Sequence, residues 1–154
     1  MRFENKGVLV TGATGGIGRE TCLQFAAEGA AVAVTDLDLA LAERLANEIE
    51  EKGGRAVGYE LDVTNQEQTD AVVNKAATDL GSIDIIFCNA GIREIQPAHQ
   101  LPLDEWRNVI EVNVTGVFVS AQSFAKHCIS KSKPGVIINT CLLYTSDAAD
   151  DPTC

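Results

Sequence analysis

Hydrophobic positions along this chain change their spacing repeatedly, and each change predicts a new secondary-structure element. Residues 7–10 form a short apolar run typical of a buried strand, and positions 17–26 then carry largely apolar side chains at helical spacing. Similar short runs predict four further strands: 31–35, 56–61, 83–88 and 136–138. Helical spacing predicts helices between them: 41–49, about 65–80, around 106, and 113 to about 130. Strands that alternate with helices in this way predict an α/β fold with a doubly wound parallel sheet.

Local start and stop signals agree with this alternation. Gly53 and Gly54 follow the second predicted helix, where glycine commonly ends a helix. Thr64 and Glu67 have the spacing of a capping box, in which two side chains satisfy the first amides of a helix. We therefore expect the third helix to begin near Asn65.

Composition and charge narrow the class of protein. The chain has 154 residues, 45% hydrophobic and 22% charged, which is the range of a single globular domain. No apolar run approaches the roughly 20 residues that cross a bilayer, and no secretory signal is recognisable, so we expect a cytoplasmic protein with no membrane partner. The net charge of −10 and the absence of a basic block argue against nucleic-acid binding. Five scattered cysteines without a C-x-x-C pair predict free thiols and no metal site.

The sequence TGATGGIG at residues 11–18 lies between the first predicted strand and the first predicted helix. Glycine-rich loops in this position bind dinucleotide phosphates, because backbone amides at the helix N-terminus approach the anion. Gly12 allows a turn with positive φ, Gly16 allows close approach of the amides, and Gly18 allows close packing. The alternative is a structural turn. Because Gly15 adjoins Gly16, the loop fits two glycine spacings and does not by itself choose a subfamily.

Asp36 ends the second predicted strand, where an acidic residue typically binds the adenosine ribose in such folds. Its charge would repel the 2′-phosphate of NADP, and the next residue, Leu37, offers no cation in compensation, so the sequence favours NAD. Asp36 could instead cap the following helix. Asp38 lies closer to that helix and is the better candidate for the cap.

Five motifs in this order resemble the short-chain dehydrogenase/reductase family, from residue 7 to about residue 140. They are TGATGGIG, Asp36, LDVT at 61–64, NAG at 89–91 and VNVTG at 112–116. The resemblance implies a Rossmann-type domain that binds NAD and interconverts alcohols and ketones by hydride transfer. NAG and VNVTG also favour this family over sugar-nucleotide epimerases with a similar glycine loop.

The resemblance also implies roles for individual residues. Asp62 would bond the amino group of adenine while Val63 contacts the ring, and the loop at 89–91 would pass beside the cofactor. Asn113 would be the active-site asparagine that organises a water-linked proton path. The full set of expected cofactor-binding residues is Gly12, Gly15, Gly16, Ile17, Gly18, Asp36, Leu37, Asp62, Val63, Asn89, Ala90 and Gly91.

The catalytic serine, tyrosine and lysine of the family have no match in this sequence. The serine would fall at about Cys141 or Leu142. Tyr144 comes too early to be the catalytic tyrosine, and the residue four positions later is Ala148 rather than a lysine that would stabilise a phenolate. We therefore expect Tyr144 not to be the catalytic acid.

The string CLLYTSDAADD resembles a translated sequencing adapter. We accordingly expect residues 1–140 to form an incomplete domain, truncated after the fifth strand, and residues 141–154 to be a non-native or disordered tail. On this interpretation strand 136–140 is an uncovered apolar edge that promotes aggregation, and the chain as given is inactive and binds NAD weakly or not at all.

For the intact parent we expect an NAD-dependent oxidoreductase of small alcohols or ketones, acting as a homo-oligomer. One alternative is a dinucleotide-sensing regulator that keeps the fold without catalysis. Another, which takes the tail as genuine, is a short protein that acts through partner contacts.

Overall fold

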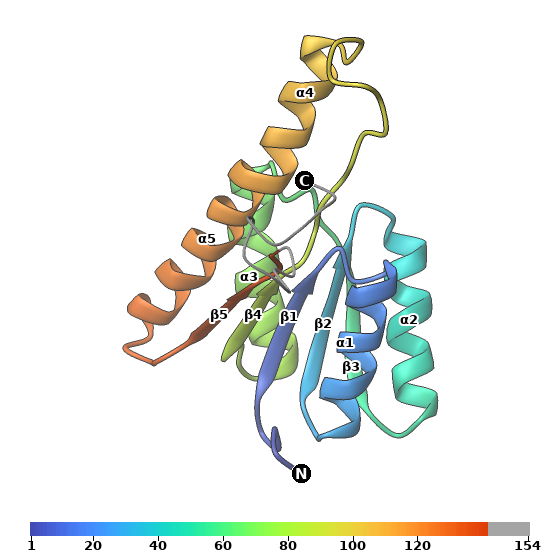
Figure 1. Ribbon diagram of the computed structural model, residues 1–154. Helices are drawn as coiled ribbons and strands as arrows, with labels where there is room; N and C mark the ends of the chain where they lie inside the picture. The colour runs from blue at the N-terminus through green and yellow to red at the C-terminus, as the bar shows by residue number, and fades with distance from the viewer. Residues whose placement is uncertain (142–154) are drawn as a thin grey trace, which may run out of the picture.

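A five-stranded parallel sheet forms the centre of the protein (Figure 1), and the computed structural model describes residues 1–141. The strands lie in the order β3-β2-β1-β4-β5. Their bounds are β1 Gly7–Thr11, β2 Ala31–Asp36, β3 Arg55–Glu60, β4 Ile85–Cys88 and β5 Val136–Asn139. All neighbouring strands pair in parallel, which confirms the predicted α/β fold.

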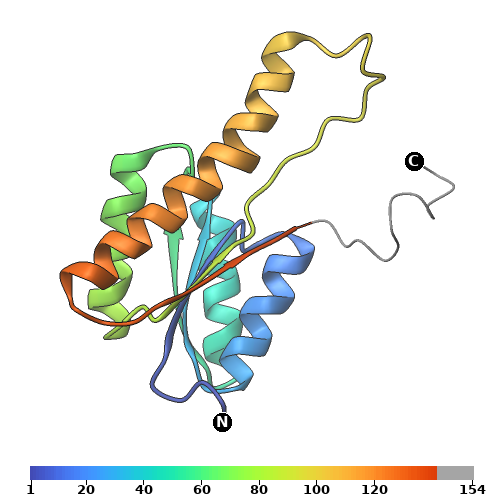
Figure 2. The same ribbon diagram turned by 60° about the vertical axis from the view of Figure 1, so that its left-hand side comes forward.

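Helices cover both faces of the sheet. In Figure 2, α1 and α2 lie on one side of the strands, and α3 and α5 lie on the other. The helical elements are α1 Gly16–Ala27, α2 Leu39–Glu51, α3 Gln66–Leu80, α4 Leu103–Ile110, the π-helical turn η1 Glu111–Thr115, and α5 Gly116–Ser130. None of these helices in the described part of the chain is both long and apolar enough to cross a membrane.

The central strands are apolar on both faces because each face has its own core. Val8 and Val10 of β1 pack into the core beneath α1 and α2, whereas Leu9 packs into the core beneath α3 and α5. All three side chains are fully buried. A parallel strand covered on both faces reads as a continuous apolar run, and this is why the strands were recognisable in the sequence.

The fifth strand is exposed within the described residues, as expected for an uncovered apolar edge. Val136, Ile137 and Ile138 are 53%, 43% and 39% exposed. β5 lies at the edge of the sheet and pairs only with β4 among the strands described. It is thus an apolar edge strand, and its sequence does not distinguish it from the buried strands.

The capping box predicted from Thr64 and Glu67 does not form. Asn65 is the N-cap of α3, and its side chain accepts a hydrogen bond of 3.0 Å from the amide of Gln68. The hydroxyl of Thr64 instead donates to Asp62 Oδ1 at 2.7 Å. The predicted start of the helix is nevertheless confirmed, because the true cap is the adjacent residue.

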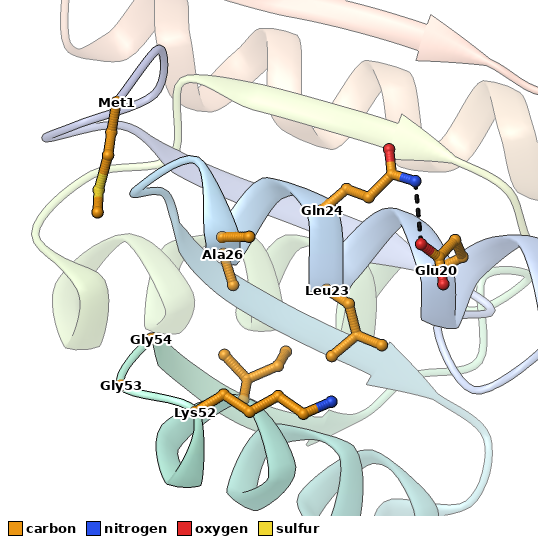
Figure 3. A pocket seen from close by; sticks show the side chains of 10 residues that line it. Met1, Glu20, Leu23, Gln24, Ala26, Lys52, Gly53 and Gly54 are labelled. Carbon is orange, nitrogen blue, oxygen red and sulfur yellow. Dashed lines mark hydrogen bonds between the residues drawn. The ribbon is translucent and has the colours of Figure 1, made fainter.

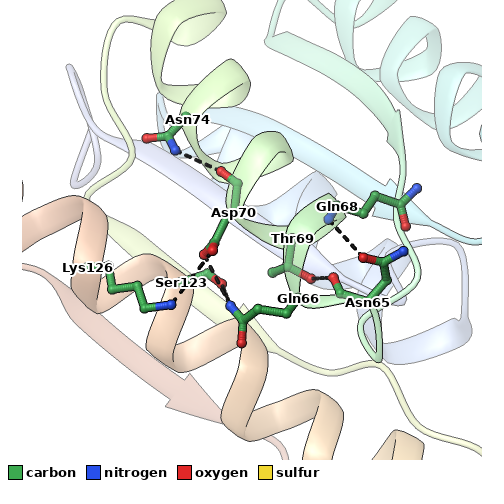
Figure 4. A network of polar contacts seen from close by, with 8 residues as sticks. All are labelled: Asn65, Gln66, Gln68, Thr69, Asp70, Asn74, Ser123 and Lys126. Carbon is green, nitrogen blue, oxygen red and sulfur yellow. Dashed lines mark hydrogen bonds and ion pairs between the residues drawn. The ribbon is translucent and has the colours of Figure 1, made fainter.

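A polar network joins α3 to α5 (Figure 4). Gln66 Nε2 donates to Ser123 Oγ at 2.9 Å and to Asp70 Oδ1 at 3.2 Å, and Lys126 Nζ lies 3.7 Å from Asp70 Oδ2. The hydrogen bond from Ser123 and the charge of Lys126 lower the pKa of Asp70 despite some desolvation. These contacts hold α5 against α3 and thereby position η1, which directly precedes α5.

The helix expected to begin at Asn113 is part of a longer helical rod. α4, η1 and α5 follow one another without a break, and Asn113 lies inside the π-helical turn between the two α-helices. The rod projects beyond the sheet at its α4 end (Figure 1), and α4 has no buried residue. Single π-helical turns often occur at functional sites.

Candidate functional site

A cleft of about 800 Å³ lies at the carboxyl ends of the strands. Its volume is within the usual range for small-molecule and cofactor sites. It is lined by Gly12, Thr14, Gly15, Gly16, Ile17, Asp36, Leu37, Leu61, Asp62, Val63, Asn89, Ala90, Gly91, Ile92, Arg93 and Val112. The structure therefore brings together all the cofactor-binding residues expected from the sequence except Gly18, which is buried behind the cleft.

Three of the four glycines in the segment TGATGGIG, at residues 11–18, meet different surroundings. Gly12 has φ = 58°, and a Cβ atom there would lie 2.7 Å from the Cα of Ala90. A Cβ at Gly18 would collide with the carbonyl oxygen of Gly12 and approach the Cα of Ala13 at 2.8 Å. At Gly16, by contrast, a Cβ would meet nothing within 4 Å. Gly12 and Gly18 are thus required by the fold, whereas the space at Gly16 is open to the cleft.

The N-terminus of α1 opens onto this cleft without a side-chain cap. Its N-cap is Gly15, which has no side chain to accept the first amide protons. The helices α2 and α3 differ, since Asp38 and Asn65 cap them through side-chain oxygens. Unsatisfied amides and the positive end of a helix dipole favour an anion at the N-terminus of α1. The open space at Gly16 gives such an anion access to the backbone, so the site fits the diphosphate of a dinucleotide.

Asp36 lies at the end of β2, opposite the glycine loop, and already holds that loop in place. Its Oδ2 accepts hydrogen bonds from the backbone amide and the hydroxyl of Thr14, at 3.0 and 2.7 Å. Its Oδ1 accepts from the amide of Leu37 at 2.9 Å. A carboxylate has about four acceptor positions, so acceptor capacity is left for a ligand. The sequence did not indicate the contact with Thr14.

The competing role for Asp36, capping of α2, belongs to Asp38 as expected. Asp38 Oδ1 accepts from the amide of Leu41 at 3.1 Å. Asp36 is therefore not needed for the cap of α2.

Asp62 and Val63 follow β3 and form the next part of the cleft wall. Asp62 Oδ1 accepts from the amide and the hydroxyl of Thr64, at 2.9 and 2.7 Å, so the residue does act as a turn former. This role leaves its second oxygen unbonded among the described residues, and Asp62 lines the cleft. Val63 is 6% exposed and packs against α5, where a Cβ at Gly116 would lie 2.6 Å from Val63 Cγ2.

The loop after β4 is tied to the end of β1 by hydrogen bonds that the sequence did not reveal. The buried hydroxyl of Thr11 accepts from the amides of Asn89 and Ala90, both at 3.0 Å. The side chain of Asn89 donates to the carbonyl oxygens of Thr11 and Gly12, at 3.2 and 3.0 Å. Thr11 and Asn89 therefore fix the two loops relative to each other at the junction of β1 and β4.

Asn113 does not line the cleft but supports its wall. Its Oδ1 accepts from the amide of Ile92 at 2.8 Å, and its Nδ2 donates to the carbonyl oxygen of Ile92 at 2.9 Å. The side chain is thus committed to the backbone of the loop after β4. In the described residues it is a positioning residue, and its catalytic role stays a prediction.

The buried thiols of the core are unreactive near neutral pH. Burial raises the pKa of Cys22 to about 12 and that of Cys88 to about 11, so both remain protonated near neutral pH. Cys141, at the position expected for the catalytic serine, is exposed. Tyr144 and Ala148 lie outside the described residues.

A second hollow, of about 370 Å³, lies between α1 and α2 (Figure 3). Leu23 and Ala26 of α1 face Ile49 of α2 across it. Its charged neighbours are committed elsewhere: Lys52 pairs with Glu48 at 2.7 Å. This hollow lacks the converging amides and carboxylates of the cleft at the strand ends.

Comparison with known proteins identifies the family to which this chain is similar. The sequence model of the family described as short chain dehydrogenase matches residues 6–150 of the chain. The matched range continues past Thr140, further than the sequence motifs predicted.

Two curated relatives are similar over most of this chain. The 3beta-hydroxysteroid dehydrogenase 1 of Eggerthella lenta is 38% identical over 138 residues, which are 89% of this chain and 53% of the relative. The cyclohexanol dehydrogenase of an Acinetobacter species is 36% identical over 140 residues, or 90% of this chain and 55% of the relative. The chain therefore spans about half the length of the curated relatives it matches.

Solved structures agree in fold. A short-chain type dehydrogenase/reductase from Mycobacterium marinum superposes with a TM-score of 0.86 at 35% identity, covering 94% of this chain and 60% of that one. An NAD+-bound xylitol dehydrogenase gives a TM-score of 0.85 at 36% identity, covering 92% of this chain and 54% of that one.

Proposed function

Because this chain belongs to the short-chain dehydrogenase/reductase family, we propose that residues 1–140 form the NAD-binding part of an oxidoreductase that interconverts alcohols and ketones. One observation carries the proposal: the uncapped N-terminus of α1 and the carboxylate of Asp36 face the same cleft. The names of two relatives, a hydroxysteroid dehydrogenase and a cyclohexanol dehydrogenase, support an alcohol substrate.

The proposed pose of the cofactor follows the order of the strands. The diphosphate meets the amides around Gly16, and the adenosine ribose meets Asp36 at the end of β2. Adenine lies beyond it, toward Asp62 and Val63 after β3. The nicotinamide half extends the other way, toward the loop after β4 that begins at Asn89. This pose uses the crevice between β1 and β4, where the order of strands reverses and where ligands of open α/β sheets typically bind.

Asp36 carries the proposed preference for NAD over NADP. Its remaining acceptor position suits a ribose hydroxyl, whereas a 2′-phosphate would place like charges side by side. Arg93 also lines the cleft, but it follows β4, whereas Asp36 ends β2. Arg93 therefore lies on the other side of β1 from Asp36.

The reaction divides between the cofactor and the protein. When bound, the nicotinamide would take hydride from the carbon of an alcohol, and the hydroxyl proton would leave to a base, so that a ketone and a reduced cofactor result. The described residues supply binding and orientation. Asn113 holds Ile92, and Thr11 holds Asn89, so the first part of the loop beside the nicotinamide is fixed at two points before a ligand binds. We assign proton transfer to groups outside residues 1–141.

Calorimetric titration of the complete protein with NAD and NADP tests the proposal. The wild type should prefer NAD, and Asp36→Asn should reduce that preference by about tenfold or more, since about 1.4 kcal/mol corresponds to a factor of ten. Asp38→Asn is the matched control: it removes an equal charge two residues away and keeps a good N-cap. A folded wild-type protein that binds neither nucleotide would disprove the proposed function. Equal effects of the two substitutions would disprove the assignment of Asp36.

A further inference from the structure

Charged side chains are separated by sign along the cleft. Its acidic residues are Asp36 and Asp62, which follow β2 and β3. Its cationic residue is Arg93, which follows β4. Because the sheet has the order β3-β2-β1-β4, the acids lie on one side of β1 and the arginine on the other. A ligand that spans the cleft therefore meets negative charge at one end and positive charge at the other.

The backbone next to Arg93 is held in place. The preceding residue, Ile92, is bonded at both its amide and its carbonyl by the side chain of Asn113. The guanidinium makes no ion pair with any residue of 1–141, whereas Arg19 and Arg107 are paired with carboxylates at 2.6 and 3.1 Å. Arg93 thus combines an anchored backbone with a charge that is still available to a ligand.

The acidic net charge of the chain makes Arg93 a stronger indication of an anionic ligand. Three of the aspartates behind the net charge of −10 lie in residues 142–154, but the rest of the chain is still acidic and disfavours anions at long range, so a cation beside the site helps an anion to bind. An arginine is well suited to this task, because its planar group donates two parallel hydrogen bonds to a carboxylate.

We propose that Arg93 binds a carboxylate of the substrate, so that the substrates are hydroxy acids and the corresponding oxo acids. This inference rests on the proposed function, which places the nicotinamide and hence the reacting carbon on the β4 side of the cleft. The diphosphate of the cofactor is the less suitable partner, because the amides of α1 already serve it beside β1. Arg93 then determines which alcohols react, while the glycine loop and Asp36 determine whether the cofactor binds.

The test compares carboxylates with matching carboxamides in the complete protein. A panel of 2- and 3-hydroxy acids, their amides, and the oxo forms of both is measured for turnover and for binding to the protein saturated with NAD or NADH. The wild type should prefer carboxylates. Arg93→Gln should lower kcat/KM for the carboxylate by about 10- to 100-fold, as expected for a lost charge-assisted pair, and change that for the amide by less than about threefold. Arg93→Lys should fall between the two, because it keeps the charge and loses the planar fork.

Arg107→Gln is the matched control, since it removes an exposed arginine of α4 that pairs with Asp104. It should leave both substrate classes unchanged. A wild-type protein that shows no carboxylate preference anywhere in the panel overturns the inference. So does an Arg93→Gln protein whose affinity for NAD falls by the same factor as its kcat/KM, because the arginine would then serve the diphosphate. Either result leaves the proposed function standing if NAD still binds, whereas failure of the wild type to bind NAD defeats the proposed function itself.

Discussion

Substitution of Gly16 by alanine should separate folding from cofactor binding. Gly16 is the first residue of α1, its φ is not in the left-handed region, and an added Cβ would meet no atom within 4 Å. The methyl group therefore creates no clash in the protein. Alanine also has less conformational freedom than glycine in the unfolded chain, so Gly16→Ala should change the free energy of unfolding by about 0 to +1 kcal/mol, in the stabilising direction.

Binding should respond in the opposite direction. The methyl group occupies the space through which we propose that the diphosphate reaches the amides of α1. Forcing extra atoms into a packed contact costs about 1–3 kcal/mol, which corresponds to a loss of affinity for NAD of about 5- to 150-fold. Calorimetric titration measures the affinity, and thermal melting of the same preparation measures stability.

Gly18→Ala provides the contrasting variant. Its Cβ would collide with the carbonyl oxygen of Gly12, which is backbone and cannot rotate away. We expect a loss of about 1–3 kcal/mol in stability from this overpacking. The reasoning is refuted if Gly16→Ala melts at a clearly lower temperature than the wild type, or if it binds NAD with unchanged affinity.

Three further predictions concern stability and reactivity. Asn113→Ala removes both hydrogen bonds to Ile92 and should lower the free energy of unfolding by about 1–2 kcal/mol at this exposed position. Denaturant unfolding measures this loss, and a loss near zero would contradict the positioning role of Asn113. Burial raises the pKa values of Cys22 and Cys88. Both thiols should therefore react with a maleimide at about pH 7 only as fast as the protein unfolds. Rapid labelling of either thiol in the native state would show that the core opens. Desolvation raises the pKa of Asp84, but hydrogen bonds from the amide of Gly7 and the hydroxyl of Ser82, with nearby lysines, lower it by more. The contribution of Asp84 to stability is therefore present above the unfolded pKa of about 4 and is lost as the pH falls through the lower folded value. Asp84→Asn should show a smaller acid destabilisation than the wild type in thermal melts across that range.

The fold was predictable because its signals are local. Each buried strand is apolar on both faces, and the glycine loop lies between a strand and a helix within a few residues. The exposure of the edge strand β5 was expected from the proposed truncation and not from its composition, because exposure depends on what packs against a strand and apolar composition alone does not reveal that. The cap of α3 was misplaced by one residue, because the hydroxyl of Thr64 bonds to Asp62 rather than to its own helix.

The parts of the site that escaped prediction depend on contacts between distant residues. Thr11 and Asn89 are 78 positions apart in the sequence, and Asn113 and Ile92 are 21 apart. The π-helical turn at Asn113 follows no residue pattern that would distinguish it from the start of an ordinary helix. Similarly, the availability of Arg93 becomes visible only when the loop after β4 is placed beside the cleft.

Amide chemical shifts of the complete protein during titration with NAD test the central claim most directly. If the diphosphate rests on the N-terminus of α1, the amides of Gly15, Gly16 and Ile17 should shift most strongly and saturate with the affinity found by calorimetry. The account is contradicted if NAD binds while these amides stay unchanged and the shifts centre instead on the hollow between α1 and α2, around Lys52.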